Sequence, residues 1–155
     1  CRLSRPLHEK GFLNLFADNC IPIHPFRAFA AELAEMRPRI RAEHQRDWQI
    51  SPSADDEEIV RRVKRNNKRF MILTQDNSTH DGGEDPRMPL VAPRNGVTCI
   101  VLARKFGQWN AQAKIDIVRG LIPELRDAFN GPRGLRYRIR LVHGTPRLVP
   151  WPVSS

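Results

Sequence analysis

The sequence predicts an α+β domain, or a small α/β domain, because short apolar runs typical of strands alternate with longer stretches of helical periodicity. The chain has 155 residues, the length of one ordinary domain. Its last three elements have the order strand, helix, strand, which is typical of a βαβ unit. We therefore expect two N-terminal helices and a three-stranded mixed sheet with a C-terminal βαβ unit. The expected divisions are an extended N-terminal arm over residues 1–24, one globular domain over 25–145 and a Pro-rich tail over 146–155.

The first expected element, the arm over residues 1–24, is irregular because Pro and Gly interrupt it. A helix is predicted from Pro25, since proline suits the first turn of a helix, and Pro38 interrupts it. Residues 40–48 continue this helical stretch with charges at most positions. The apolar side chains of the first helix recur at spacings of three and four residues, as one buried stripe requires: Phe26, Phe29, Ala30, Leu33 and Met36.

The second predicted helix begins after Ser53, whose hydroxyl can cap its first turn. Asp56 stands where a capping box has its acidic residue, and four consecutive acidic residues lie near the positive end of the helix dipole. A strand over 70–74 follows the helix. The apolar positions of the helix are Ile59, Val60 and Val63.

Three further elements are predicted after a long polar loop over residues 76–96. Residues 97–103 are apolar at both odd and even positions, which is typical of a central strand covered on both sides. A long amphipathic helix follows, in which Pro123 is expected to kink or split the helix and Gly131 to end it. The alternating pattern over 135–142 predicts a strand parallel to 97–103.

The strong basic charge of the chain favours an anionic partner. The sequence contains 21 Arg and 5 Lys, has a formal net charge of +9 and an isoelectric point near 10.5. A hydrophobic content of 40% and a charged content of 28% are those of a globular protein. We expect nucleic acid first as the partner, and an acidic protein or a membrane surface second.

The basic residues form two clusters. The first lies over 61–69, at the end of a helix with an acidic start, where cations also stabilise the helix dipole. Six basic residues in nine exceed that need, so we expect contacts with phosphate groups. The residues predicted to contact nucleic acid in the two clusters are Arg61, Arg62, Lys64, Arg65, Lys68, Arg69, Arg133, Arg136, Arg138, Arg140 and Arg147.

Three arginines of the second cluster alternate with apolar residues. On a strand, Arg136, Arg138 and Arg140 would form one cationic row. Either a polyanion or acidic residues of the chain's own helices would neutralise this row. Few aromatic side chains are present for base stacking, so binding to RNA phosphates would depend on salt and only weakly on sequence. The side chains expected to face inward are Tyr137, Ile139, Leu141 and His143.

No catalytic motif, cofactor motif or small-molecule substrate site stands out in the sequence. Cys99 lies in an apolar run and is expected in the core, whereas Cys1 and Cys20 could pair in an oxidising compartment. No Cys and His spacing indicates zinc, and no apolar run approaches the roughly 20 residues of a membrane span.

Two histidines and a polar loop contain side chains that could take part in catalysis or metal binding. His80 and His143 could support acid–base cleavage of RNA, although nothing in their spacing brings them together. A metal could bind in the loop, but the regular ligand spacing of a calcium site is absent. The loop residues in question are His80, Asp81, Glu84 and Asp85.

Three functions remain open on this basis. The first is a non-catalytic, RNA-contacting structural subunit of a large ribonucleoprotein, such as a mitochondrial-ribosome-type protein, with RNA and neighbouring proteins as partners. The second is a secreted basic enzyme or effector such as a ribonuclease. The third is a protein-binding adaptor of a membrane or respiratory complex. The expected location is mitochondrial, with secretion as the alternative.

Overall fold

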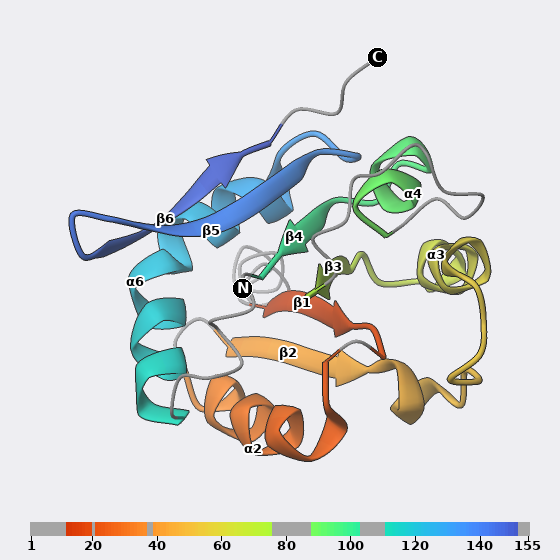
Figure 1. Cartoon of the computed structure of the whole chain (residues 1–155), viewed down its shortest axis with the longest axis horizontal. Coiled ribbons are helices and arrows are strands. Elements are labelled where there is room, and N and C mark those ends of the chain that lie inside the picture. Colours follow the sequence, from red (N-terminus) through yellow and green to blue (C-terminus); the bar gives the residue numbers. More distant parts are fainter. Residues whose placement is uncertain (1–11, 20, 37–38, 76–87, 103–110, 152–155) are drawn as a thin grey trace, which may run out of the picture.

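A six-stranded sheet with helices on both faces forms the molecule. The computed structural model describes residues 12–19, 21–36, 39–75, 88–102 and 111–151 (Figure 1). The strands are β1 (Phe12–Ala17), β2 (Arg39–His44), β3 (Met71–Thr74), β4 (Cys99–Val101), β5 (Arg136–Val142) and β6 (Thr145–Pro150). The helices are α2 (Ile23–Ala34), α3 (Asp56–Arg65), α4 (Met88–Arg94) and α6 (Ala111–Asn130), with a 3₁₀ turn, η1 (Gln45–Trp48), after β2.

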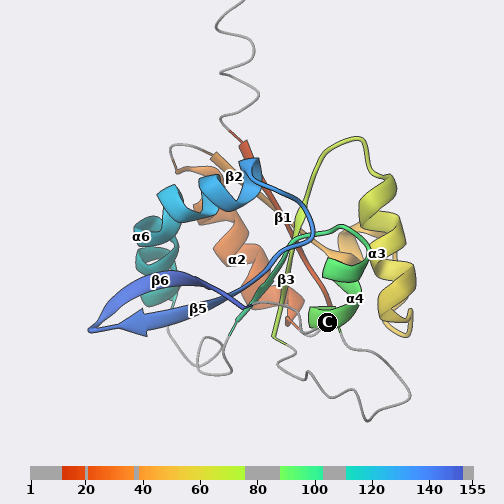
Figure 2. The ribbon, with the colours of Figure 1, turned by 90° about the horizontal axis from the view of Figure 1, so that it is seen from above.

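The strand order is β2-β1-β3-β4-β5-β6, with every neighbouring pair parallel except the antiparallel pair β5 and β6. The first described strand, β1, lies inside the sheet, β2 follows on one side of it, and β3 pairs with its other side. The order therefore reverses between β1 and β3, as in doubly wound sheets. In Figure 2, β1, β3 and β4 run from the top of the view towards the bottom, so their carboxyl ends lie on the side that faces the viewer in Figure 1.

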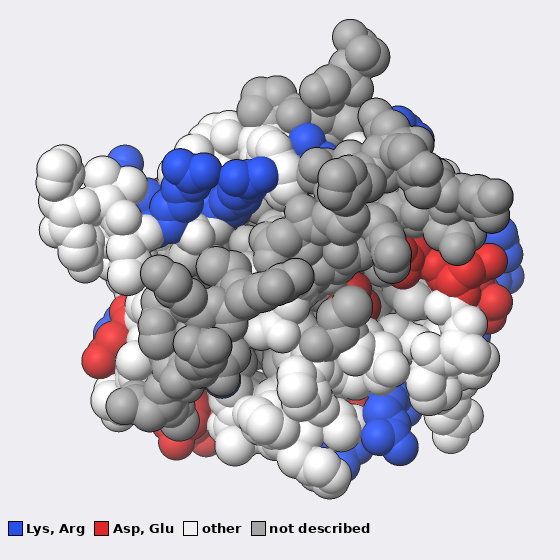
Figure 3. Space-filling model, in the orientation of Figure 1, with Lys and Arg blue, Asp and Glu red and all other residues white. Residues whose placement is uncertain are grey.

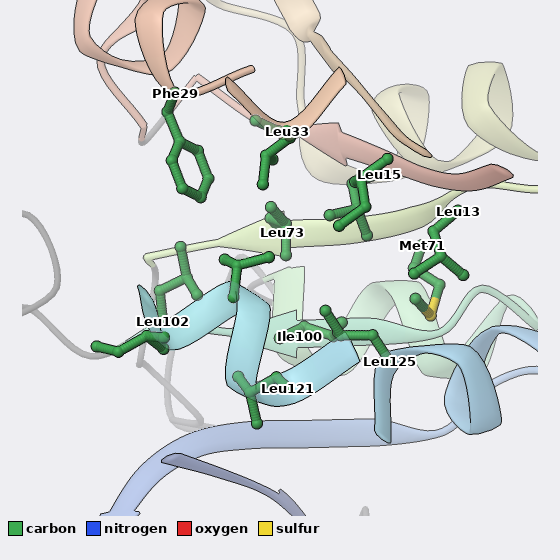
Figure 4. Close-up of a cluster of buried hydrophobic side chains, with 14 of the residues drawn as sticks. Leu13, Leu15, Phe29, Leu33, Met71, Leu73, Ile100, Leu102, Leu121 and Leu125 are labelled. Atoms are coloured by element: carbon green, nitrogen blue, oxygen red, sulfur yellow. The ribbon is translucent and has the colours of Figure 1, made fainter. Parts of the chain in front are cut away.

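Helices α2 and α6 cover one face of the sheet, and Figure 4 shows the core between them. Leu15 of β1, Leu73 of β3 and Ile100 of β4 point towards Leu33 of α2 and Leu121 of α6 (Figure 4). All five are at most 5% exposed. Burial of one such side chain contributes about 1.5–3 kcal/mol.

Helices α3 and α4 cover the other face, on the opposite side of the sheet in Figure 2. Phe16, Ile72 and Cys99 alternate with the residues of the first core and pack on this side. Val60 of α3 and Val91 of α4 pack against them. Because both faces are buried, the central strands are apolar at odd and even positions alike.

The predicted class, a mixture of helices and one mixed sheet, is confirmed, but the predicted three-stranded sheet is wrong because six strands are present. The predicted arm over 1–24 contains β1, which lies between β2 and β3. Its residues are apolar on both parities, with Asn14 as the exception, so a buried parallel strand is hard to distinguish from an irregular apolar arm.

Four other expectations also differ from the structure, in whole or in part. The stretch 40–48 was expected to be helical, yet it contains β2 and η1, since pairing with β1 outweighs the weak helical pattern. The loop over 76–96 contains α4, and residues 146–150 of the expected tail lie in β6. Helix α6 continues through Pro123 to Asn130, so of the two effects expected of Pro123, a kink or a split, the split does not occur.

The remaining elements agree with their predictions. The helix from Pro25, the helix that begins near Asp56 and the strand over 70–74 correspond to α2, α3 and β3. The parallel pairing within the C-terminal βαβ unit is confirmed by Cys99 and Val101, which pair with Arg136 and Arg138.

Candidate functional site

The two edges of the parallel sheet carry different polar side chains. At the amino ends of β3, β4 and β5, basic residues from two clusters surround a pocket. At the carboxyl ends, a buried carboxylate follows β1 and an acidic turn begins α3.

The amino-edge pocket has a volume of about 160 Å³ and is mainly polar. Its cationic residues are Lys64, Lys68, Arg69 and Arg133, so the fold unites members of the two predicted clusters. The lining residues come from the last turn of α3 and from the segments that precede β3, β4 and β5. Its other lining residues are Val63, Asn66, Asn67, Phe70, Gly96, Val97 and Thr98.

Arg69 is held firmly at this edge. Its Nη2 donates to the carbonyl oxygen of Gly131 at 3.0 Å, and its Cζ lies 5.5 Å from the centre of the Phe129 ring. Its own carbonyl oxygen accepts a hydrogen bond from Asn14 Nδ2 at 3.0 Å. Burial lowers the pKa of Arg69, and the nearby charge of Arg133 lowers it further. The two guanidinium groups therefore lie close enough to repel each other.

The predicted cationic row on β5 is not uniformly available to a ligand. Arg136 is only 5% exposed. Its Nε donates to the carbonyl oxygen of Trp151 at 2.9 Å, and its Nη1 donates to that of Pro89 at 3.1 Å. Burial lowers the pKa of Arg136, and the charge of Arg138 adds to this effect. Arg136 thus joins the C-terminal segment to α4, a structural role.

The rest of the row becomes more exposed along β5. Arg138 is half-buried, with its Cζ 3.4 Å from the centre of the Trp151 ring, whereas Arg140 is exposed. Arg140 lies directly opposite Arg147 of β6, and Arg147 is 3.6 Å from a carboxylate oxygen of Glu124. The guanidinium groups of Arg140 and Arg147 therefore remain accessible to an anion.

Two inward-facing positions on β5 were predicted incorrectly. Tyr137 and Ile139 pack against the core as expected, but Leu141 is 50% exposed. The reason is that β4 pairs with β5 only as far as Arg138, so the hairpin extends beyond the covered sheet. His143 is exposed and lies in the turn between β5 and β6, with a φ of 54°.

The other basic residues of the first cluster face different surroundings. Arg62 and Arg65 line a wide, open depression beside Trp48, and Arg62 Nη2 donates to the Trp48 carbonyl oxygen at 3.3 Å. Arg61 is exposed on α3 and lines neither the depression nor the amino-edge pocket. The six residues therefore do not form one surface.

At the carboxyl edge, Asp18 directly follows β1 and is 3% exposed. Its N–H donates to the carbonyl oxygen of Leu73 at 3.2 Å, which extends the pairing of β1 with β3. By strand alternation, Asp18 shares the α3 face with Phe16, and Thr74, which is fully buried, shares that face with Ile72. A carboxylate is thus buried where the strand order reverses.

A buried glutamine links this position to the segment before α3. The Gln45 side chain is fully buried, and its Oε1 accepts a hydrogen bond from the N–H of Asn19 at 2.9 Å. Its Nε2 donates to the carbonyl oxygen of Ser51 at 2.8 Å. The loop after β1 and the approach to α3 are therefore tied together at the carboxyl edge.

Helix α3 begins at this same edge with an acidic turn. Asp55 is the N-cap, and its Oδ1 accepts a hydrogen bond from the N–H of Glu58 at 2.8 Å. Asp56 is half-buried in the first turn. On the face shown in Figure 3, acidic side chains gather over the start of α3, and Lys and Arg side chains lie over β5 and β6.

An apolar cavity of about 110 Å³ lies beside the same edge, between α2 and the sheet. Phe26 and Phe29 of α2 line it, together with Leu73, Leu102 and Lys114. Its few polar groups give it little means of orienting a ligand. We therefore assign it no chemistry.

The sequence did not identify Asp18, Gln45 or Thr98 as functional candidates. Asp18 fell within the supposed arm, and the burial of the other two depends on contacts distant in sequence. A carboxylate at the end of an apolar run was the available signal for Asp18, once that run was recognised as a strand.

Several expectations concern residues outside the described parts of the chain: the pairing of Cys1 with Cys20, and any role of His80, Asp81, Glu84 or Asp85. Cys99 is fully buried, as expected. Within the described ranges, no three His, Cys, Asp or Glu residues form a group able to hold a metal alone. No described helix combines the length and apolarity needed to cross a bilayer.

No protein-family model, no curated protein and no solved structure matches this chain.

Proposed function

We propose that this protein is a divalent-metal-dependent nuclease that acts on RNA at the carboxyl edge of its sheet. The observation that carries the proposal is the burial of Asp18, at 3% exposure, directly after the central strand β1. Ligands of doubly wound sheets bind beyond the carboxyl ends of the strands, where the order reverses. A carboxylate at that point lies where a ligand of such a sheet would bind, and carboxylate oxygens are ligands that Mg²⁺ uses.

The surrounding charges suit a phosphodiester substrate. Mg²⁺ commonly uses one or two protein carboxylates and completes its shell with water and substrate phosphate oxygens. Asp18 and the half-buried Asp56 would supply these carboxylates, and Arg138 and Arg140 would hold the RNA backbone. This division of roles matches the acidic and basic regions of Figure 3.

The proposed reaction is hydrolysis of one phosphodiester bond. A metal ion held by Asp18 and Asp56 would supply an activated water for this hydrolysis, in which the water oxygen forms a bond to phosphorus and the bond from phosphorus to one ribose oxygen breaks. That ribose oxygen takes up a proton and leaves as a hydroxyl group. The buried Asp18 would keep the metal beside the sheet edge, and Arg140, on the other side of the molecule, would bind a phosphate further along the RNA.

A cleavage assay on single-stranded RNA with Mg²⁺ or Mn²⁺ tests the proposal. We expect Asp18→Asn and Asp56→Asn each to reduce the rate by about 100-fold or more. Asp127→Asn is the matched control, because Asp127 is an exposed carboxylate in the last turns of α6, at the amino edge. We expect it to retain the full rate, and a chelator to abolish cleavage by every variant.

Thermal unfolding of each variant separates chemistry from stability, because Asp18 is buried and its substitution can affect folding. Asp56→Asn provides the second test on a less buried side chain. Full cleavage by both variants, or no cleavage by the unaltered protein with either metal, would overturn the nuclease proposal.

A second candidate is a non-catalytic RNA-contacting subunit of a ribonucleoprotein, with a mitochondrial location as its expected setting. The observation in its favour is the gathering of Lys64, Lys68, Arg69 and Arg133 around one pocket at the edge opposite to Asp18. Salt-dependent RNA binding by the unaltered protein without metal-dependent cleavage would support this candidate instead.

A further inference from the structure

We infer that the amino-edge pocket is a binding site for a dianionic phosphate group, separate from the carboxyl edge proposed for catalysis. The pocket lies at the amino ends of β3, β4 and β5 and has a volume of about 160 Å³. Four cationic side chains line it, and no acidic residue is among its lining residues. A concave site of one charge sign suits a compact anion.

An unsatisfied hydroxyl group gives the pocket a specific polar contact. Thr98 lines the pocket and is only 2% exposed, yet its Oγ1 has no hydrogen-bond partner among the described residues. Buried hydroxyl groups are nearly always hydrogen-bonded, so an orphaned one calls for an explanation. A phosphate oxygen in the pocket would accept a hydrogen bond from this hydroxyl.

The backbone around Thr98 holds its hydroxyl in place. The carbonyl oxygen of Thr98 accepts a hydrogen bond from the N–H of Ile72 at 2.9 Å, and the N–H of Val97 donates to Ala92 at 2.9 Å. Thr98 is therefore fixed to the sheet and to α4 before any ligand binds. Such preorganisation reduces the entropic cost of binding.

Lys64 lies beside Gly96 at the edge of the pocket. The φ of Gly96 is +81°, a conformation that favours glycine, and a Cβ at this position would lie 3.8 Å from Lys64 Nζ. The ammonium group of Lys64 is therefore close to the backbone just before Thr98. Lys64 from α3 and Thr98 from the segment before β4 therefore line the same pocket.

Arg69 and Arg133, which also line the pocket, would be stabilised by a bound anion. Arg133 lowers the pKa of Arg69, after the larger effect of burial, which means that the two positive charges repel across a short distance. Arg69 is already held by Gly131 and Phe129 and has little freedom to move away. A bound phosphate would relieve this repulsion and accept hydrogen bonds from guanidinium groups.

Titration of the full chain with inorganic phosphate, followed by calorimetry and by amide chemical shifts, tests the site. We expect the largest shifts at Gly96 and Thr98, and an affinity about tenfold weaker in Thr98→Val and in Lys64→Gln. Arg61→Gln is the matched control, since Arg61 is an exposed cation on the same helix and lies outside the pocket. Its affinity should stay within about twofold of the unaltered protein.

A stability measurement distinguishes a ligand contact from a structural role of Thr98. Valine keeps the branched shape and removes an unpartnered hydroxyl, so Thr98→Val should unfold at the same or a higher temperature without phosphate. Loss of phosphate affinity without loss of stability supports the site. No binding of millimolar phosphate, or equal affinities of Thr98→Val and Arg61→Gln, would overturn it.

The source of the phosphate is resolved by two RNA oligonucleotides that differ only in a 5′-phosphate or a 5′-hydroxyl end. If the pocket holds a terminal phosphate of RNA, the phosphorylated oligonucleotide should bind more tightly, and Thr98→Val should remove the difference. Equal binding of the two, together with phosphate binding, assigns the site to free phosphate or a small phosphorylated molecule. Neither result depends on cleavage at Asp18.

Discussion

Arg136 and Trp151 contact each other twice: the Arg136 Cζ lies 4.0 Å from the centre of the indole ring, and its Nε donates to the Trp151 carbonyl oxygen at 2.9 Å. The same ring lies 3.4 Å from the Cζ of Arg138. One indole therefore covers two adjacent guanidinium groups of β5 and lowers their mutual repulsion through its electron-rich face. This contact keeps the residue after β6 against the core formed with α3 and α4.

Trp151→Ala should lower the free energy of unfolding by about 2 kcal/mol, because it removes both cation–π contacts and part of the second core. Trp151→Phe should lose about half as much, since a smaller ring remains over the arginines. Urea unfolding monitored by circular dichroism measures both values. Equal stability of the alanine variant and the unaltered protein would contradict the role assigned to the ring.

The alternating arginines were predictable from the sequence, but the burial of Arg136 was not. Its acceptors are carbonyl oxygens of Pro89 and Trp151, which lie 47 and 15 positions away along the chain. A period-two pattern assigns side chains to faces of a strand and says nothing about what covers each face. The covering elements, α4 and the end of β6, were themselves expected to be loop and tail.

Asp55→Ala should destabilise α3 by about 1 kcal/mol, because the Asp55 carboxylate accepts a hydrogen bond from the N–H of Glu58 at the helix start. Ser53 is the matched control, since the sequence favoured it as the cap while its hydroxyl contacts Ser51 instead. We expect Ser53→Ala to change stability by less than about 0.5 kcal/mol. Thermal unfolding of the two variants compares them directly, and a larger loss in Ser53→Ala would reassign the cap.

Asp47 should make stability depend on pH. Burial acts to raise its pKa, but the hydrogen bonds from Arg27 and from the N–H of His44, and the charge of Arg27, lower it below the ordinary value of 3.8. A folded pKa below the unfolded one means that the ionised form stabilises the fold above about pH 4, and that this contribution disappears as pH falls through the folded pKa.

Asp47→Asn should therefore be less stable than the unaltered protein at pH 7 and equally stable near pH 2. The difference should be below about 1 kcal/mol, because the Arg27 and Asp47 side chains are 58% and 37% exposed. Urea unfolding at several pH values measures it, and Arg27→Gln should reproduce the same trend. A difference that grows towards low pH would show the opposite sign and exclude this linkage.

Some residues of the proposed sites could be identified from the sequence, and others could not. The basic segment 61–69 and Arg133 were singled out by charge alone, and the fold brings Lys64, Lys68 and Arg69 to Arg133. The sequence did not indicate Thr98 as a site residue, because an uncharged threonine in an apolar run does not stand out. The sequence did not indicate Asp18 either, because β1 was expected to be part of an irregular arm. Without β1, the reversal of strand order at the carboxyl edge could not be recognised.

Arg140→Gln should weaken binding of single-stranded RNA and lower the slope of log affinity against log salt by about 0.7, the release expected for one lost phosphate contact. Arg140 is exposed at a hairpin position, directly opposite Arg147, so its loss removes charge without disturbing the core. Arg119→Gln is the control, because Arg119 is exposed on α6 and lies 3.6 Å from the carboxylate of Asp116. Filter binding from low to physiological salt gives both slopes. If Arg119→Gln reduces the slope as much as Arg140→Gln, the β5–β6 hairpin has no special role and net charge alone determines the affinity.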